Sequence, residues 1–98
     1  MAKGYLIAEA KVADPAAYES YKQLAQAAIA KFGGRYLVRG GAVEVLEGGW
    51  SVPRLVVVEF DSVEQAKKFY DSPEYRAARA ARQDAASMNM LVVEGLQL

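Results

Sequence analysis

The sequence predicts an α+β fold whose elements follow the order strand, helix, strand, strand, helix, strand. Segments rich in β-branched and aromatic residues alternate with segments whose apolar residues recur every three or four positions. Between these segments stand the usual boundary signals, which are Asp-Pro or Ser-Pro before a helix and paired glycines after one. A chain of 98 residues has room for one such domain, so we expect a single domain over residues 1–98.

The first strand is expected over residues 4–12, and a helix follows from Pro15 to Phe32. Asp14 is suited to cap this helix, and proline is favoured at its first position. Apolar residues recur along one side of the helix while lysines and glutamines occupy the other, which is typical of an amphipathic helix. The pair Gly33-Gly34 then ends it.

A second strand begins at Arg35, and its course beyond Gly40-Gly41 has two interpretations. Two glycines inside an extended run indicate a bend or bulge, so the segment up to Gly48 is either one long kinked strand or a short hairpin. Residues 54–60, RLVVVEF, form the most apolar strand, and we expect this strand at the centre of the sheet.

Overlapping capping signals mark the second helical region. Asp61 and Ser62 are each followed three residues later by an acidic or amide side chain, which is the capping-box pattern. Ser72-Pro73 then restarts a helix, which we expect to continue to about Ala85. Residues 88–96, MNMLVVEGL, form the last strand.

This order of elements, βαββαβ, is that of the ferredoxin-like fold. We expect its four-stranded sheet to be antiparallel, except that the two central strands, the first and the third, are expected to run parallel. The second and fourth strands are expected at the edges. The connections are long enough for the right-handed crossovers that such a fold needs.

Alternation along the strands divides their side chains between two faces. One set is apolar throughout and suits the helices: Leu6, Ala8, Ala10, Val12, Tyr36, Val38, Val56, Val58, Phe60, Leu91 and Val93. The other set mixes large apolar groups with charges: Tyr5, Ile7, Glu9, Arg35, Leu37, Arg39, Leu55, Val57, Glu59, Met90, Val92 and Glu94. A patch this apolar usually marks an interaction site, so we expect a second copy of the same sheet to cover it in a homodimer, as in a dimeric α+β barrel.

The charges on this second face have two interpretations. Glu9 and Glu59 are expected near one end of the central strands, with Arg35 at the matching end of the neighbouring strand. Buried carboxylates need a cation or a proton, and Arg35 could simply neutralise Glu59. Alternatively, these groups line a small-molecule pocket in which desolvation raises the pKa of a glutamate. The candidate acid or base residues are Glu59 and Glu9, and the candidate ligand-binding residues are Tyr5, Tyr18, Tyr21, Arg35, Arg39, Trp50 and Glu94.

Composition argues against several other classes of function. Twelve basic residues balance twelve acidic ones without forming a run, which argues against nucleic acid and membrane surfaces as partners. The chain has no cysteine and no histidine, so we expect no disulfide, no zinc site and no cofactor. No stretch resembles a signal peptide or a membrane span, and a cytoplasmic location is the default expectation.

Several segments together resemble a family of small bacterial proteins, domain of unknown function 1330. They are FGGRYLVRGG, VLEGGW, RLVVVEF, AKKFYDSPEY, the arginine at Arg82 and the closing VEG, and they extend from about Tyr18 to Gly95. The resemblance implies the dimeric α+β barrel type of fold and no established activity. Independently of this resemblance, Arg82 falls late in a predicted helix, where the helix dipole favours a cation, and we expect it to form a structural ion pair.

Three functions stay open at this point. The chain is a cofactor-free enzyme that uses a glutamate as acid or base, a module that binds a small organic ligand without converting it, or a structural dimer filled by its own side chains. Trp50 lies in a loop beside Glu47 and is either a lid or an interface anchor. No nucleophile motif or phosphate-binding loop favours one of the three.

Overall fold

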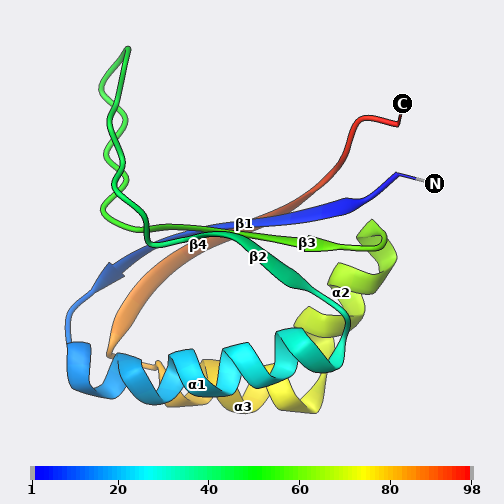
Figure 1. The fold of residues 1–98 in the computed structure, drawn as a ribbon. Coiled ribbons are helices and arrows are strands. Elements are labelled where there is room, and N and C mark those ends of the chain that lie inside the picture. Colours follow the sequence, from blue (N-terminus) through cyan, green and yellow to red (C-terminus); the bar gives the residue numbers. More distant parts are fainter. Residues whose placement is uncertain (1, 98) are drawn as a thin grey trace.

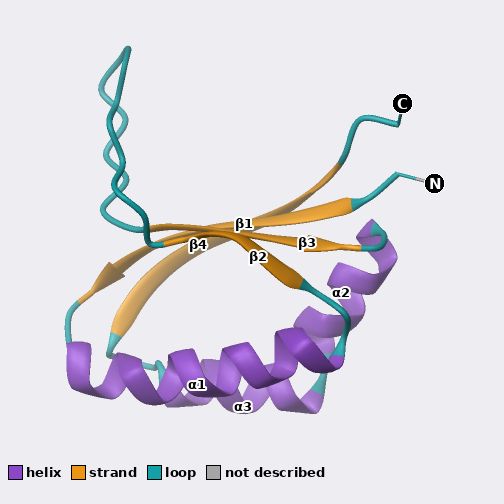
Figure 2. Cartoon of the chain, viewed as in Figure 1, coloured by secondary structure: helices purple, strands orange, loops and turns teal. Residues whose placement is uncertain are grey.

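Four strands form one sheet in the computed structural model, which describes residues 2–97 (Figure 1). The elements are β1 (Gly4–Val12), α1 (Pro15–Lys31), β2 (Arg35–Arg39), β3 (Leu55–Phe60), α2 (Val63–Asp71), α3 (Pro73–Ala81) and β4 (Ala86–Glu94). All three helices lie against the same face of the sheet, and the other face carries no helix (Figure 2). The predicted order of elements is confirmed, with the second helical region divided into α2 and α3.

The sheet has the strand order β2-β3-β1-β4, so β1 and β3 are central as predicted. The prediction that these two strands run parallel was wrong, because β3 pairs antiparallel with both β1 and β2. No crossover helix separates β2 from β3, so the chain reverses between them and β3 opposes both neighbours. Glu9 and Glu59 consequently lie at opposite ends of the central pair, where Glu9 faces Leu55 and Glu59 faces Tyr5.

The predicted helix caps are present. Asp14 accepts a hydrogen bond from the backbone N–H of Ala17 at 3.2 Å, and Ser62 accepts one from Gln65 at 3.0 Å. The buried Ser72 serves two helices, because its hydroxyl donates to the Phe69 carbonyl at 2.7 Å and accepts from the Tyr75 N–H at 3.1 Å. α3 ends at Ala81 rather than near Ala85, since Asp84 adopts a left-handed conformation (φ 66°) that a helix cannot include.

An aromatic cluster holds the helices to the sheet. The Phe69 ring centre lies 5.2 Å from that of Phe60 on β3 and 4.5 Å from that of Tyr75 on α3. These three rings are essentially buried, and so is Val58 on β3. Burial of each large apolar side chain contributes about 1.5–3 kcal/mol, so this cluster is a main source of stability for the two-layer structure. α1 adds its own buried stripe: Tyr18, Tyr21, Ala25, Ala28 and Ile29.

The predicted faces of β4 are reversed in the structure. Met90 and Val92 pair with Ala8 and Leu6 and pack against the core, whereas Leu91 and Val93 are exposed on the uncovered face. The run MLVV has no polar residue to mark the outer side, so alternation could not fix which face each residue takes. Pairing with β1 decides the faces instead.

A bulge in β2 reverses the faces of its second half. Tyr36 pairs with Val58 and Val38 with Val57, so β2 holds one extra residue at Leu37. Beyond this point Val38 takes the uncovered face and Arg39 takes the helix-covered face, contrary to the predicted assignment. The irregularity lies at Leu37 and not at Gly40-Gly41, where the sequence indicated it.

Residues 40–54, which we call the arm, connect β2 to β3 and contain neither strand nor helix. The arm projects from the sheet on the side away from the helices, so residues 43–48 form neither of the two predicted strand arrangements (Figure 1). It carries four exposed apolar side chains: Val43, Val45, Leu46 and Trp50. Its two ends are fixed to the sheet, because the Gly40 N–H donates to the Leu55 carbonyl at 2.8 Å and the Arg54 carbonyl accepts from Ala10 at 3.0 Å.

Replacement of Gly40 by alanine is expected to destabilise the protein by about 1–2 kcal/mol. Gly40 has φ +73°, and an added Cβ atom would overlap the Arg54 guanidinium. Gly41→Ala is the matched control, because no atom lies within 4 Å of its added Cβ and its φ is not positive. Urea unfolding of both variants tests this, and equal midpoints would contradict the expected role of Gly40.

Candidate functional site

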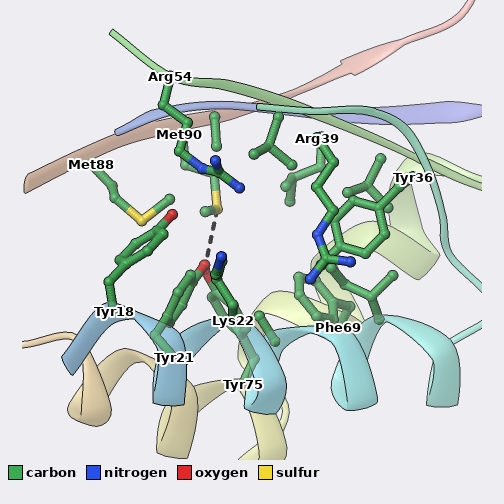
Figure 3. Close-up of a pocket in the computed structure, with 16 residues that line it drawn as sticks. Tyr18, Tyr21, Lys22, Tyr36, Arg39, Arg54, Phe69, Tyr75, Met88 and Met90 are labelled. Atoms are coloured by element: carbon green, nitrogen blue, oxygen red, sulfur yellow. Dashed lines mark hydrogen bonds between the residues drawn. The ribbon is translucent and has the colours of Figure 1, made fainter. Parts of the chain in front are cut away.

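A pocket lies between α1 and the helix-covered face of the sheet (Figure 3). Six small or aliphatic side chains line it, and Met88, Met90 and Phe69 complete the apolar part. The polar lining consists of four tyrosines, Tyr18, Tyr21, Tyr36 and Tyr75, and three cations, Lys22, Arg39 and Arg54. No carboxylate lines it. The free space is about 30 Å³, room for one or two waters, so a larger ligand has to displace the long cationic side chains.

Two tyrosine hydroxyls meet inside the pocket. The hydroxyls of Tyr21 on α1 and Tyr75 on α3 are 2.8 Å apart, and that of Tyr75 also donates to the Met90 sulfur at 3.9 Å. Burial raises the pKa of both phenols above the ordinary value of 10.0. Both therefore stay protonated at neutral pH and can act as hydrogen-bond partners of a ligand, but not as bases.

Two arginines reach the pocket from the sheet. The Arg39 guanidinium lies over the ring of Tyr36 at 4.5 Å from its centre, and that of Arg54 lies over Tyr18 at 5.7 Å. Both point toward α1, while Tyr18, Tyr21 and Lys22 point from α1 toward the sheet (Figure 3). The Nε of Arg54 is buried and has no hydrogen-bond partner among residues 2–97.

The three cations of the pocket differ in whether a nearby carboxylate neutralises their charge. Lys22 forms an ion pair with Glu19 at 2.8 Å on the surface of α1. Within residues 2–97, no carboxylate lies within ion-pair distance of Arg39 or Arg54. The two arginines therefore give the pocket an uncompensated positive charge.

Arg82 forms no ion pair within the described part of the chain, contrary to the prediction from its place in the helix. Its guanidinium lies over the ring of Tyr21 at 5.6 Å, and its Nε is buried without a partner. Burial has the largest effect on the pKa of Tyr75 and raises it, and the nearby positive charge of Arg82 opposes this effect. Arg82 thus lies next to the Tyr21 ring, at the C-terminal end of α3, where the helix dipole favours a cation.

The uncovered face holds a separate polar cluster of Tyr5, Arg35 and Glu59. The Tyr5 hydroxyl donates to Glu59 at 2.9 Å, and Arg35 forms an ion pair with the other oxygen of the same carboxylate. The Glu59 side chain is only 11% exposed, whereas that of Arg35 is 71% exposed. The hydrogen bond from Tyr5, followed by that from Arg35, holds the pKa of Glu59 below its ordinary value. This direction is opposite to the expected effect of desolvation.

Glu9 lies at the other end of the uncovered face. It accepts a hydrogen bond from Asn89 at 2.7 Å and borders a shallow hollow that includes Ile7, Leu55 and Trp50. The Trp50 side chain is 70% exposed. Glu94 is exposed at the end of β4, apart from all these groups.

The structure thus distributes the predicted site residues over two faces of the sheet. Tyr18, Tyr21 and Arg39 share the pocket under α1. Five other candidates lie on the uncovered face or at its margin: Tyr5, Glu9, Arg35, Trp50 and Glu59. Glu94 belongs to neither group, because it is exposed at the end of β4 and follows Val92 on the helix-covered side.

Sequence reasoning missed Arg54 and Tyr75 as pocket residues. Arg54 is separated from Val56 and Val58 by two and four residues, so alternation along β3 already placed it on the helix-covered face. Tyr75 follows the Ser72-Pro73 break, at the start of α3. The contact of its hydroxyl with Tyr21 joins two residues that are 54 positions apart in sequence, and no local pattern reports such a contact.

Within residues 2–97, no three acidic side chains gather in a way that could hold a metal ion. The helices in the same range are also too short or too polar to cross a membrane.

The chain belongs to the family described as Domain of unknown function (DUF1330), whose model matches residues 3–96. This confirms the resemblance that the sequence motifs indicated. No curated protein matches the chain.

Solved structures with the same fold share little sequence with this chain. A protein of unknown function from Rhodopseudomonas palustris is 20% identical over 99% of this chain and 85% of its own length, with a TM-score of 0.75. A dimeric protein of unknown function and ferredoxin-like fold from Bacteroides fragilis is also 20% identical, over 94% of this chain and 95% of its own, with a TM-score of 0.62. SnoaB, a cofactor-independent oxygenase from Streptomyces nogalater, is 13% identical over 100% and 97%, with a TM-score of 0.66. At these identities the similarity shows the ferredoxin-like fold and not an activity.

Replacement of Tyr5 by phenylalanine is expected to raise the pKa of Glu59 toward the ordinary carboxyl value of 4.5. Because the pKa of Glu59 is lower in the folded state than the ordinary value, the ionised carboxylate stabilises the fold at pH values above 4.5. This stabilisation is lost as the pH falls through the folded-state pKa of Glu59. NMR titration of the Glu59 carboxyl carbon measures the change.

Tyr18→Phe serves as the control, because Tyr18 lies on the other face of the sheet. A Glu59 pKa above 4.5 in the unaltered protein, or an equal change in both variants, would contradict the assigned role of Tyr5.

Proposed function

We propose that this protein is a homodimer of the α+β barrel type that binds a small organic molecule in the pocket between α1 and the sheet. The observation that carries the proposal is the buried Arg54 Nε, which lacks a partner in a largely apolar, tyrosine-lined pocket. Buried donors in native proteins are nearly always satisfied, and a pocket with a few convergent polar groups is typical of a ligand site.

The uncovered sheet face supports the homodimer. It exposes Leu91 and Val93 on β4 and Leu37 on β2, and the apolar arm rises on the same side. Pairing two such faces would remove this apolar surface from water and enclose the cluster around Glu59. The Bacteroides fragilis protein of the same fold is described as dimeric, which agrees with this arrangement.

Binding without conversion fits the pocket better than acid-base catalysis does. The pocket has no carboxylate, its buried tyrosine pair is held in the protonated form, and its other polar groups are cations. Glu59 and Glu9 lie on the uncovered face, so they are candidate acid or base residues only for a ligand in the interior of the dimer. Glu9 beside the hollow at Trp50 favours this second candidate site.

Native reporters separate the two sites. Met88 lines the pocket under α1 and not the hollow, whereas Met90 lines both. Trp50, which is the only tryptophan, borders the hollow on the uncovered face. With a library of small aromatic and aliphatic compounds, we expect ligands to shift the Met88 methyl NMR signal and leave the Trp50 indole N–H signal unchanged. Ligands that shift only the indole signal would place the site on the uncovered face and overturn the proposal.

Leu91→Glu is expected to weaken the dimer at least about tenfold, because a buried unpaired charge costs well over the 1.4 kcal/mol that a tenfold change represents. Leu24→Glu on the exposed side of α1 is the matched control and should leave the dimer intact. Native mass spectrometry over a dilution series measures both. An unaltered protein that is monomeric at micromolar concentration would refute the homodimer.

A further inference from the structure

We propose that the ligand of the pocket between α1 and the sheet is a small, flat organic anion, such as an aromatic carboxylate. This inference rests on the proposed small-molecule site and specifies the chemistry of its ligand.

The charge of the pocket supports an anion. Arg39 and Arg54 both line the pocket, and neither has a carboxylate within ion-pair distance in residues 2–97. The third cation of the pocket, Lys22, is already paired with Glu19. Arg39 is exposed to solvent, whereas Arg54 is partly buried, and a partly buried guanidinium without a counter-charge is unfavourable. An anionic ligand would supply the counter-charge that the chain itself does not.

The position of each arginine leaves its hydrogen-bond donors free for an oxygen. The guanidinium carbons of Arg39 and Arg54 lie over the rings of Tyr36 and Tyr18, at 4.5 and 5.7 Å from the ring centres. The N–H donors of a guanidinium point outward in its own plane, where they match the two oxygens of a carboxylate. The Arg54 Nε, buried and without a partner, is one such donor.

The remaining wall suits a flat unsaturated body. Met88 and Met90 face the pocket, and thioether side chains adapt to and contact aromatic rings favourably. The Tyr75 hydroxyl stays protonated and donates only to the Met90 sulfur at 3.9 Å, so its proton can turn to an oxygen of the ligand. The free space of about 30 Å³ means that any ligand displaces the cationic side chains, and a single ring requires a smaller displacement than a larger body.

Pairs of matched compounds test separately whether binding depends on the negative charge of the ligand and on its flat ring. Titrations of the full chain with benzoate and benzamide, followed by the methyl signal of Met88, test the charge. Titrations with benzoate and cyclohexanecarboxylate test the flat ring. We expect benzoate to bind at least about tenfold more tightly than benzamide, as charge-assisted hydrogen bonds imply, and more tightly than cyclohexanecarboxylate.

Two variants locate the anion. Arg54→Gln is expected to weaken benzoate binding at least about tenfold and benzamide binding by a smaller factor, because the neutral carbonyl of benzamide makes a weaker hydrogen bond to a guanidinium than a carboxylate does. Arg76→Gln, an exposed arginine on α3, is the control and should change neither. If Arg54→Gln fails to fold, Arg39→Gln replaces it, and the comparison of compounds on the unaltered protein does not depend on either variant.

The outcomes distinguish the two proposals. Equal binding of benzoate and benzamide at the Met88 signal would overturn the anion while leaving the pocket as a small-molecule site. Benzoate binding that shifts only the Trp50 signal would overturn both. Binding of neutral compounds with no binding of any carboxylate at millimolar concentration would also overturn the anion.

Discussion

The break between α2 and α3 at Ser72 is the constraint on which the helical layer depends. One buried hydroxyl satisfies the end of α2 and the start of α3, so the chain turns there without leaving polar backbone groups unpaired. The turn brings Phe69 and Tyr75 into contact and directs α3 along α1 (Figure 1). The Tyr75 hydroxyl consequently reaches Tyr21, and the pocket acquires its polar centre.

One extra residue in an edge strand determines the chemistry of the pocket. Without the bulge at Leu37, alternation would place Arg39 on the uncovered face, which is the face that Arg35 occupies. The bulge turns Arg39 to the helix-covered face, where it meets the ring of Tyr36. The first half of the same strand keeps Arg35 beside Glu59, so a strand of five residues places one arginine on each face of the sheet.

The sequence predicted those parts of the fold that local interactions determine. Helix starts at Asp14, Ser62 and Ser72 follow from side chains that bond to nearby backbone, and they were placed correctly. The faces of β1 and β3 followed from alternation that a clear core side supports. The faces of β4 did not, because its apolar run has no alternation and its register depends on β1.

The candidate site was harder to predict because it depends on pairing between distant segments. The antiparallel central strands separate Glu9 from Glu59, although both were expected at the same end. Arg39 was named as a ligand-binding candidate, but its face depends on a bulge that no glycine marks. Arg54 was the one pocket cation that strand alternation alone could have found.

The arm joins the uncovered face to the pocket on the opposite side. Arg39 immediately precedes it and Arg54 is its last residue, so the two pocket arginines stand at its two ends. In the proposed dimer, contacts that order the arm would also restrict the backbone that carries both guanidinium groups. Part of the conformational entropy lost on binding an anion would then already be lost on assembly. Subunit association and ligand affinity would be thermodynamically linked, with each strengthening the other by the same factor.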